Sequence, residues 1–278
     1  MSSPSAFSAY PGRHAHERTH RTRVRPGHGL LSGKRLVITA AAGAGIGSAT
    51  VLKCLEEGAA SVVLGDTHGG RLAEAEKQLG ERFGAERVRS VVCDVTREEQ
   101  ITELLDAAEE LGPIDVMINN AGLGGSTPIL DMTDEEWSRV LDITLTGTFR
   151  CIRAVGKRMV AAETSGVIVN NASVIGWRAQ AEQAHYAAAK AGVMALTRSA
   201  AIDLAAHGIR VNAVSPSLAM HPFLEKVTTP ELLEQLTARE AFGRGAEPWE
   251  VANVMVFLAS AYSSYMTGEV VSVSSQHA

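Results

Sequence analysis

The stretch that decides the fold is residues 36–47, Leu-Val-Ile-Thr-Ala-Ala-Ala-Gly-Ala-Gly-Ile-Gly. Its first four residues form a short apolar run, which is typical of a buried strand. The next part is a glycine-rich turn that holds the candidate phosphate-contacting residues Gly43, Gly45, Ile46 and Gly47. A helix is predicted at 48–57, before Gly58. A strand, a glycine-rich turn and a helix N-terminus in this order present backbone N–H groups to a pyrophosphate, so we predict a dinucleotide site here.

Strand-like and helix-like segments alternate along the rest of the chain. Strands are predicted at 36–39, 61–65, 88–93, 114–118, 167–171, 210–214 and 270–273. Helices are predicted at 48–57, 71–83, 98–111, 135–161, 186–207 and 248–259. This alternation predicts an α/β fold with one doubly wound parallel sheet covered by helices on both faces. A length of 278 residues suits a single domain of this class.

The composition excludes several classes of protein. Hydrophobic residues make up 45% and charged residues 21%, as in soluble globular proteins. No apolar stretch approaches the length of a membrane-spanning helix, so we expect no membrane partner. A net charge of −5 argues against a nucleic-acid partner. Three widely spaced cysteines exclude a disulfide scaffold and fit reduced, buried thiols in a cytoplasmic protein.

Residues 1–29 differ from the remainder and are predicted to be a flexible basic arm, leaving 30–278 as the folded domain. Their arginine-rich composition also fits a mitochondrial transit peptide, but prolines and glycines interrupt any long helix there. Residues 16–20 spell His-Glu-Arg-Thr-His, the pattern of zinc proteases. This segment lacks an apolar face with which a helix could pack, so we predict no metal site.

Polar and small residues follow the second, third and fourth predicted strands. Asp66 lies 19 residues beyond Gly47, where an acidic residue binds the adenosine ribose. A carboxylate there repels a 2′-phosphate, which favours NAD over NADP. Arg71 lies five residues later and is interpreted as a solvated surface charge. The other candidate cofactor-binding residues are Asp94, Val95, Asn120, Ala121 and Gly122. The carboxyl ends of parallel strands share one edge, so we expect a single cleft.

Three residues carry the predicted chemistry. Tyr186 and Lys190 are four apart on a predicted helix and share a face. Ser173 follows the fifth strand and can hydrogen-bond a substrate oxygen. A neighbouring ammonium and a cationic nicotinamide favour the phenolate, so we expect a lowered pKa for Tyr186. Tyr186 would move a proton while the cofactor moves a hydride.

These motifs resemble the short-chain dehydrogenase/reductase family over residues 30–275. The resemblance implies a Rossmann-type domain, a Ser-Tyr-Lys active site with Lys190 also holding the cofactor's ribose, and a homotetramer. It also extends to Arg210-Val211-Asn212-Ala213-Val214 and to Pro216 beyond them, a candidate cofactor contact.

The sequence departs from the family pattern at several points. The glycine loop is one residue longer than usual, and alanine stands where the first glycine is expected. Thr144 replaces the family's fourth catalytic residue, an asparagine. Ser217 follows Pro216 in place of glycine, and His221 replaces a threonine that holds the carboxamide. The last strand ends Val-Ser-Ser at 273–275, where Asp-Gly-Gly is common.

Residues 39–50, 171–190 and 248–276 resemble more specifically a group of actinobacterial reductases of steroid ring C/D breakdown. That resemblance implies oxidation or reduction of a bicyclic indane-carboxyl-coenzyme A intermediate. A lid is predicted at about 217–245, with apolar residues Leu218, Met220, Phe223, Leu224, Leu232, Leu233 and Leu236. These residues suit a bulky alicyclic substrate, or they form an amphipathic helix packed on the body. Candidate contacts to coenzyme A phosphates are Arg178, Arg239 and Arg244.

Other functions stay open from sequence. An enzyme of this fold could instead reduce 3-oxoacyl thioesters, or act on a simple sugar or alcohol. A protein that senses a dinucleotide without turnover is a second class, although Tyr186 and Lys190 are both present. The basic arm could also recruit an anionic partner.

Overall fold

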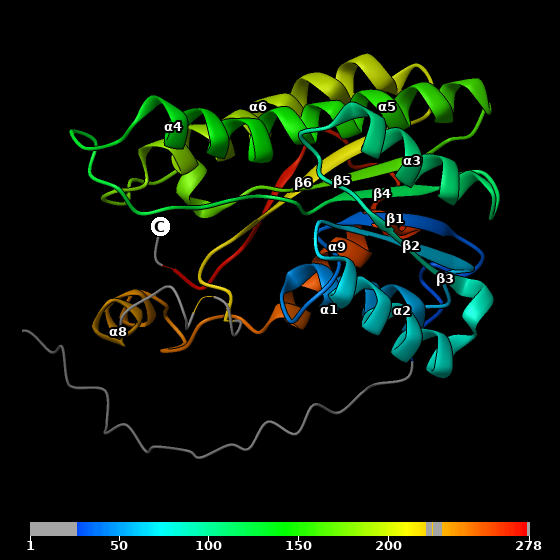
Figure 1. Cartoon of the computed structure of the whole chain (residues 1–278), viewed down its shortest axis with the longest axis horizontal. Coiled ribbons are helices and arrows are strands. Elements are labelled where there is room, and N and C mark those ends of the chain that lie inside the picture. Colours follow the sequence, from blue (N-terminus) through cyan, green and yellow to red (C-terminus); the bar gives the residue numbers. More distant parts are fainter. Residues whose placement is uncertain (1–26, 221–223, 225–229, 277–278) are drawn as a thin grey trace, which may run out of the picture.

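A seven-stranded parallel sheet forms the centre of the protein. The computed structural model describes residues 27–220, 224 and 230–276 (Figure 1). The strands are β1 (Arg35–Thr39), β2 (Ser61–Asp66), β3 (Val88–Val92), β4 (Val116–Asn119), β5 (Val167–Asn171), β6 (Arg210–Pro216) and β7 (Val270–Val273). Their order across the sheet is β3-β2-β1-β4-β5-β6-β7, and each neighbouring pair is parallel. The predicted doubly wound sheet is confirmed, with its topological switch point between β1 and β4.

Helices cover both faces of this sheet (Figure 1). One layer holds α1 (Ile46–Glu56), α2 (Gly69–Phe83) and α9 (Pro248–Ala259), and the other holds α3 (Glu98–Glu109), α5 (Gly147–Ala161) and α6 (Ala184–Ala205). Leu36 and Ile38 of β1 belong to the first core, whereas Val37 belongs to the second. Alternate side chains of one strand are therefore buried on opposite faces, which explains why the strands read as nearly continuous apolar runs.

One predicted helix is wrong in part. The segment 135–161 is not a single α-helix, because α4 (Asp134–Leu141) and α5 are joined by a π-helical segment at Asp142–Thr146. A π segment inserts one extra residue per turn and often occurs at functional sites. Its centre is Thr144, whose side chain is fully buried. The other predicted elements differ from the observed ones by a few residues at their ends, where helices fray and strands lengthen.

The described residues bear on three further expectations. No helix among them combines the length and the apolar character that crossing a membrane requires. No group of three or more metal-ligating side chains is found within the described ranges, and the His-Glu-Arg-Thr-His motif lies outside them. Cys54, Cys93 and Cys151 are free and buried, as predicted. Most of the predicted arm, residues 1–26, also lies outside the described part.

Candidate active site

The glycine-rich turn lies between β1 and α1, at the switch point of the sheet. Gly45 is the N-cap of α1, and Gly43 has a φ of +120°, which favours glycine. A Cβ on Gly47 would lie 2.1 Å from the Ala40 carbonyl oxygen, so only glycine fits there. The first N–H groups of α1 have no partner within the helix. The loop thus lets a bound group come close to its backbone and offers free N–H donors. Both properties suit the binding of a pyrophosphate.

Ala40 stands where the family usually has its first glycine, and its backbone shows the consequence. It has a φ of +48°, a left-handed conformation that glycine adopts without strain. Its carbonyl accepts a hydrogen bond from Asn120 Nδ2 at 3.1 Å. Contacts from neighbouring strands therefore hold this residue in place.

Asp66 ends β2 beside this turn and is only 7% exposed. Its carboxylate accepts hydrogen bonds from the backbone N–H groups of Ala42 and His68, both at 3.1 Å. The Arg71 guanidinium lies 3.6 Å from Asp66 Oδ1, so Arg71 is not simply a solvated charge, although its side chain is half exposed. A cavity of about 300 Å³ opens here, lined in part by Gly43, His68 and Arg71.

The predicted residues after β3 and β4 also lie at this edge. Asp94 Oδ1 accepts hydrogen bonds from the backbone N–H and the hydroxyl of Thr96, so one carboxylate oxygen serves the turn. Val95 is buried and would contact a Cβ on Gly147 of α5 at 2.6 Å. The backbone N–H groups of Asn120 and Ala121 each donate to Thr39 Oγ1 at 3.0 Å. These bonds tie the loop after β4 to the glycine-rich turn.

The structure brings Ser173, Tyr186 and Lys190 together. Ser173 follows β5 and is 8% exposed, and its side chain forms a hydrogen bond with Tyr186. Lys190 lies one turn beyond Tyr186 on α6, with Nζ 5.5 Å from the centre of the Tyr186 ring. The Lys190 ammonium donates a hydrogen bond to the carbonyl of Asn171, at the end of β5. The three side chains can therefore act on one substrate oxygen.

The expected lowering of the Tyr186 pKa is wrong for the cofactor-free protein. Burial raises the pKa of Tyr186 to about 12, and the hydrogen bond with Ser173 only opposes this rise. Burial also lowers the pKa of Lys190 to about 8. Desolvation disfavours the charged form of both groups. Tyr186 is therefore protonated at neutral pH.

Thr144 holds the loop after β4 against the active site. Its hydroxyl accepts a hydrogen bond from the Leu123 N–H at 2.9 Å and donates one to the Leu123 carbonyl at 3.2 Å. A Cβ on Gly122 would lie 3.3 Å from Lys190 Nζ and 3.7 Å from Thr144 Oγ1. The loop therefore passes close to both Thr144 and Lys190 at Gly122, where a side chain would press on the Lys190 ammonium.

Two residues that were not predicted as site residues also shape this edge. Asn171 joins the parts of the site, because its carbonyl accepts from Lys190 and its Nδ2 donates to Asn120 Oδ1 at 2.9 Å. Ser217 follows Pro216 at the end of β6, and its Oγ is buried without a partner. The available signal was position: Asn171 ends β5 two residues before Ser173, and Ser217 comes directly after β6.

The residues present fit a nicotinamide dinucleotide. The glycines of the turn at 43–47 leave space that side chains would otherwise fill. The Asp66 carboxylate lies beside this turn and can accept hydrogen bonds. The unpartnered Oγ of Ser217 comes directly after Pro216, which is a candidate cofactor contact. A buried polar atom without a partner is costly unless a ligand satisfies it.

The segment after β6 folds back on itself. Ala246 N donates to the Leu218 carbonyl at 2.7 Å, and Met220 N donates to the Ala246 carbonyl at 2.8 Å. The helix α8 (Pro230–Ala238) lies between these ends. Of the predicted lid residues, Leu218, Met220, Leu224, Leu233 and Leu236 are half-buried, whereas Phe223 and the Leu232 side chain lie outside the described part. The structure therefore describes most of the predicted lid.

The three candidate arginines have different surroundings. Arg244 forms a two-pronged ion pair with Glu250, at 2.6 and 2.8 Å. Arg239 is exposed near the end of α8. Arg178 is half-buried and donates to Gln276 Oε1. Arg244 is therefore already engaged by an acid, which counts against it as a phosphate contact.

Comparisons with known proteins agree with this geometry. A family model described as enoyl-(acyl carrier protein) reductase matches residues 40–275. A (5R,7aS)-5-hydroxy-7a-methyl-1-oxo-2,3,5,6,7,7a-hexahydro-1H-indene-carboxyl-CoA reductase of Mycobacterium tuberculosis is 60% identical, over 90% of this chain and 95% of its own. A cis-4-hydroxycyclohexanecarboxylate dehydrogenase of Sinomonas cyclohexanicum is 41% identical, over 86% of this chain and 95% of its own.

A solved structure supports the same assignment. The crystal structure of a short-chain dehydrogenase from Mycobacterium smegmatis is 55% identical and superposes with a TM-score of 0.81. The match covers 91% of this chain and 97% of that one. With the seven-stranded sheet and the matched family model, these relatives show that the chain belongs to the short-chain dehydrogenase/reductase family of oxidoreductases, which use nicotinamide dinucleotide cofactors.

Proposed function

We propose that this enzyme interconverts a secondary alcohol and a ketone on a bicyclic, steroid-derived indane-carboxyl-CoA intermediate, with NAD as cofactor. The observation that carries this proposal is the meeting of Ser173, Tyr186 and Lys190 beside the glycine-rich turn. A bound nicotinamide would supply or accept the hydride. The remaining chemistry is a proton transfer at the substrate oxygen, and side chains of this chain perform it.

Tyr186 is the residue that donates or accepts the proton of the substrate oxygen. In the reductive direction, the Tyr186 O–H bond breaks and a new O–H bond forms on the substrate oxygen, while Ser173 donates a hydrogen bond to that oxygen. A tyrosine with a pKa near 12 in the cofactor-free protein carries its proton at neutral pH, which suits this direction. Lys190 places a partly desolvated ammonium beside the ring and stabilises the phenolate that remains. It also holds ribose hydroxyls.

Tyr186→Phe tests this chemistry. The variant keeps the ring and removes the hydroxyl, so we expect turnover to fall at least about a thousandfold, because proton transfer is lost. The dissociation constant for NADH, measured by fluorescence titration, should change little. Substantial turnover in the variant would refute Tyr186 as the acid and base.

Asp66 supports NAD as the cofactor. Its carboxylate lies at the end of β2, beside the turn that would hold the pyrophosphate. A fixed negative charge there accepts from two ribose hydroxyls and repels a 2′-phosphate. Arg71, near the same carboxylate, reduces this repulsion in part, so we expect a preference for NAD rather than absolute selection.

Thr144 acts as a positioning residue in place of the family's asparagine. Its hydroxyl both donates to and accepts from the backbone of Leu123. An asparagine side chain could make the same pair of bonds, because its amide is also a donor and an acceptor. Thr144 thus fixes the loop at Gly122, where an added Cβ would lie 3.3 Å from Lys190 Nζ.

The substrate class rests on the relatives and the lid. One relative is named for reduction of a hydroxy-methyl-oxo-hexahydroindene-carboxyl-CoA, and another for oxidation of a hydroxycyclohexanecarboxylate. Both names describe an alicyclic ring that carries a carboxyl-derived group. The leucines of the lid, Leu218, Leu224, Leu233 and Leu236, supply apolar surface for such a ring. Reduction of a 3-oxoacyl thioester is the alternative.

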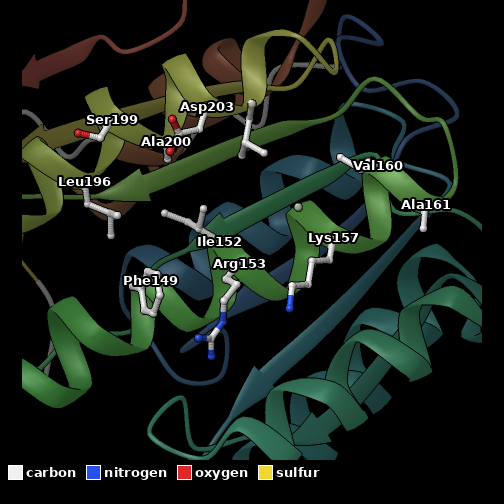
Figure 2. A pocket seen from close by; sticks show the side chains of 12 residues that line it. Phe149, Ile152, Arg153, Lys157, Val160, Ala161, Leu196, Ser199, Ala200 and Asp203 are labelled. Carbon is white, nitrogen blue, oxygen red and sulfur yellow. The ribbon is translucent and has the colours of Figure 1, made fainter.

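We also propose that the enzyme assembles as a homotetramer through α5 and α6. Figure 2 shows a cavity between these helices, and its volume is about 500 Å³. Apolar side chains line much of it, including Phe149, Ile152, Val160 and Leu196. Basic Lys157 and acidic Asp203 lie on its two sides. A two-fold axis along this groove would bring each charge toward its opposite on a second copy.

A further inference from the structure

A chain of hydrogen bonds joins the lid, the C-terminal segment and the loop after Ser173. Glu240, beyond α8, is 4% exposed, and its carboxylate accepts from the Leu218 N–H at 3.3 Å and from Ser275 Oγ at 2.7 Å. It also accepts from Gln276 Nε2 at 3.0 Å. Gln276 Oε1 in turn accepts from the Arg178 guanidinium. Both ends of the lid are thus connected to Arg178.

Gln276 lies between a carboxylate and a guanidinium, and this fixes its amide. The NH₂ end can only donate to Glu240, and the oxygen end can only accept from Arg178. In a buried setting such an alternation strengthens each bond. Arg178 is therefore held in one position before any substrate binds.

Arg178 retains unused donors. A guanidinium carries five N–H groups, and across residues 27–220, 224 and 230–276 Gln276 is its only side-chain partner. The Arg178 side chain is half-buried. A partly desolvated guanidinium with free N–H groups binds carboxylate and carbonyl oxygens well.

Arg178 is also close to the reacting centre. The loop makes one 3₁₀ turn at Val174–Gly176. Arg178 lies five residues beyond Ser173, and its backbone N–H donates to the Val174 carbonyl at 3.0 Å, so the loop folds back at this point. A Cβ on Gly176 would lie 3.0 Å from the backbone of Lys190 and Ala191, so the loop is pressed against α6. A residue so near Ser173 is placed for a group on the ring system itself, whereas coenzyme A phosphates lie beyond a long pantetheine arm.

We propose that Arg178, held by Gln276 and Glu240, binds the oxygen of the carboxyl-derived group that the alicyclic substrate carries. This inference rests on the proposed function and adds the residue that recognises the end of the substrate opposite the reacting carbon. Its partner is the carbonyl oxygen of a thioester or the oxygen of a free carboxylate. Arg178 thereby selects ring alcohols with a carboxyl-derived group over plain ring alcohols.

The test compares three alcohols: 4-hydroxycyclohexanecarboxyl-CoA, the free acid cis-4-hydroxycyclohexanecarboxylate, and 4-methylcyclohexanol, which lacks a carboxyl group. With Arg178→Gln we expect kcat/KM for the first or the second to fall about tenfold to a hundredfold, mainly through KM, because a hydrogen bond to a charged group is lost. The value for 4-methylcyclohexanol should stay unchanged. Arg82→Gln, at an exposed position of α2, is the matched control and should alter none of them.

A second variant and a binding measurement separate recognition from folding. Gln276→Leu leaves Arg178 in place but removes its partner, so we expect a smaller loss in the same direction. The dissociation constant of the thioester, measured by calorimetry in a Tyr186→Phe background, should rise with Arg178→Gln. A larger loss for the acid assigns a carboxylate as the partner, and a larger loss for the thioester assigns its carbonyl.

Three results would overturn the inference in different ways. If the unmodified enzyme prefers the carboxyl-bearing alcohols and Arg178→Gln keeps that preference, the role of Arg178 is wrong and the proposed function stands. If the unmodified enzyme shows no such preference, the proposed substrate class is wrong and the proposed role of Arg178 is wrong with it. An equal loss with all three alcohols would mean a merely structural role.

Discussion

Replacing Lys190 with methionine is expected to stabilise the cofactor-free protein although it removes a residue of the proposed active site. Burial lowers the pKa of Lys190 from 10.5 to about 8, so the folded state binds this proton less tightly than the unfolded chain does. One pKa unit corresponds to 1.36 kcal/mol, so below pH 8 the buried ammonium costs about 3 kcal/mol. The hydrogen bond to the Asn171 carbonyl returns about 1 kcal/mol. The expected net gain is about 2 kcal/mol.

The sign of the pH dependence follows from the same numbers. A lysine with a depressed pKa in the folded state destabilises that state fully below pH 8. The penalty shrinks as the pH rises from about 8 toward 10.5, because the folded state is then already deprotonated and the unfolded chain gains less and less from binding the proton. Lys190→Met should therefore be more stable than the unmodified protein at pH 7. Its advantage should disappear near pH 10.5.

The assay is thermal unfolding of the cofactor-free protein at fixed concentration, at several pH values. A gain of about 2 kcal/mol corresponds to a rise of about 4–8 °C in Tm for a chain of this size. Lys77→Met, an exposed lysine of α2, is the control and should stay within about 0.5 kcal/mol. A lower Tm for Lys190→Met at pH 7, or a gain that does not vary with pH, would refute the account of this buried charge.

Two further substitutions test the cofactor and loop assignments. Asp66→Ala should lower the ratio of kcat/KM with NAD to kcat/KM with NADP by at least about tenfold, because a fixed charge that repels the 2′-phosphate is removed. An unchanged ratio would contradict the role of Asp66. Thr144→Val leaves the Leu123 N–H without its partner, so kcat should fall about tenfold or more, whereas Thr144→Ser keeps the hydroxyl and should retain most activity. Equal activity of the valine and serine variants would rule out a positioning role for this hydroxyl.

The sequence predicted the fold well because its signals are local and repeated. Apolar runs, glycine turns and helical periodicity fixed seven strands and their order in the chain, and the parallel sheet followed from the alternation. The π segment at Asp142–Thr146 was not predictable in this way. Its central residue, Thr144, bonds to Leu123, which lies 21 residues away in the sequence.

The residues of the site were more predictable than their energetics. Ser173, Tyr186 and Lys190 follow from spacing, and the structure brings them together. The pKa of Tyr186 was expected to fall, but burial raises it, and burial depends on everything packed around the ring. The network of Glu240, Gln276 and Arg178 joins segments up to 98 residues apart, so no local pattern points to it.

The most direct test of the central claim is turnover at 340 nm, with NAD or NADP, on a panel of alicyclic and acyclic alcohols. The panel includes steroid-derived hydroxyindane carboxylates as free acids and as coenzyme A thioesters, together with simple 3-hydroxyacyl thioesters. We predict that the hydroxyindane-carboxyl-CoA thioester with NAD gives the highest kcat/KM. A higher value on the simple 3-hydroxyacyl thioesters would contradict the claim and identify a reductase of 3-oxoacyl thioesters instead.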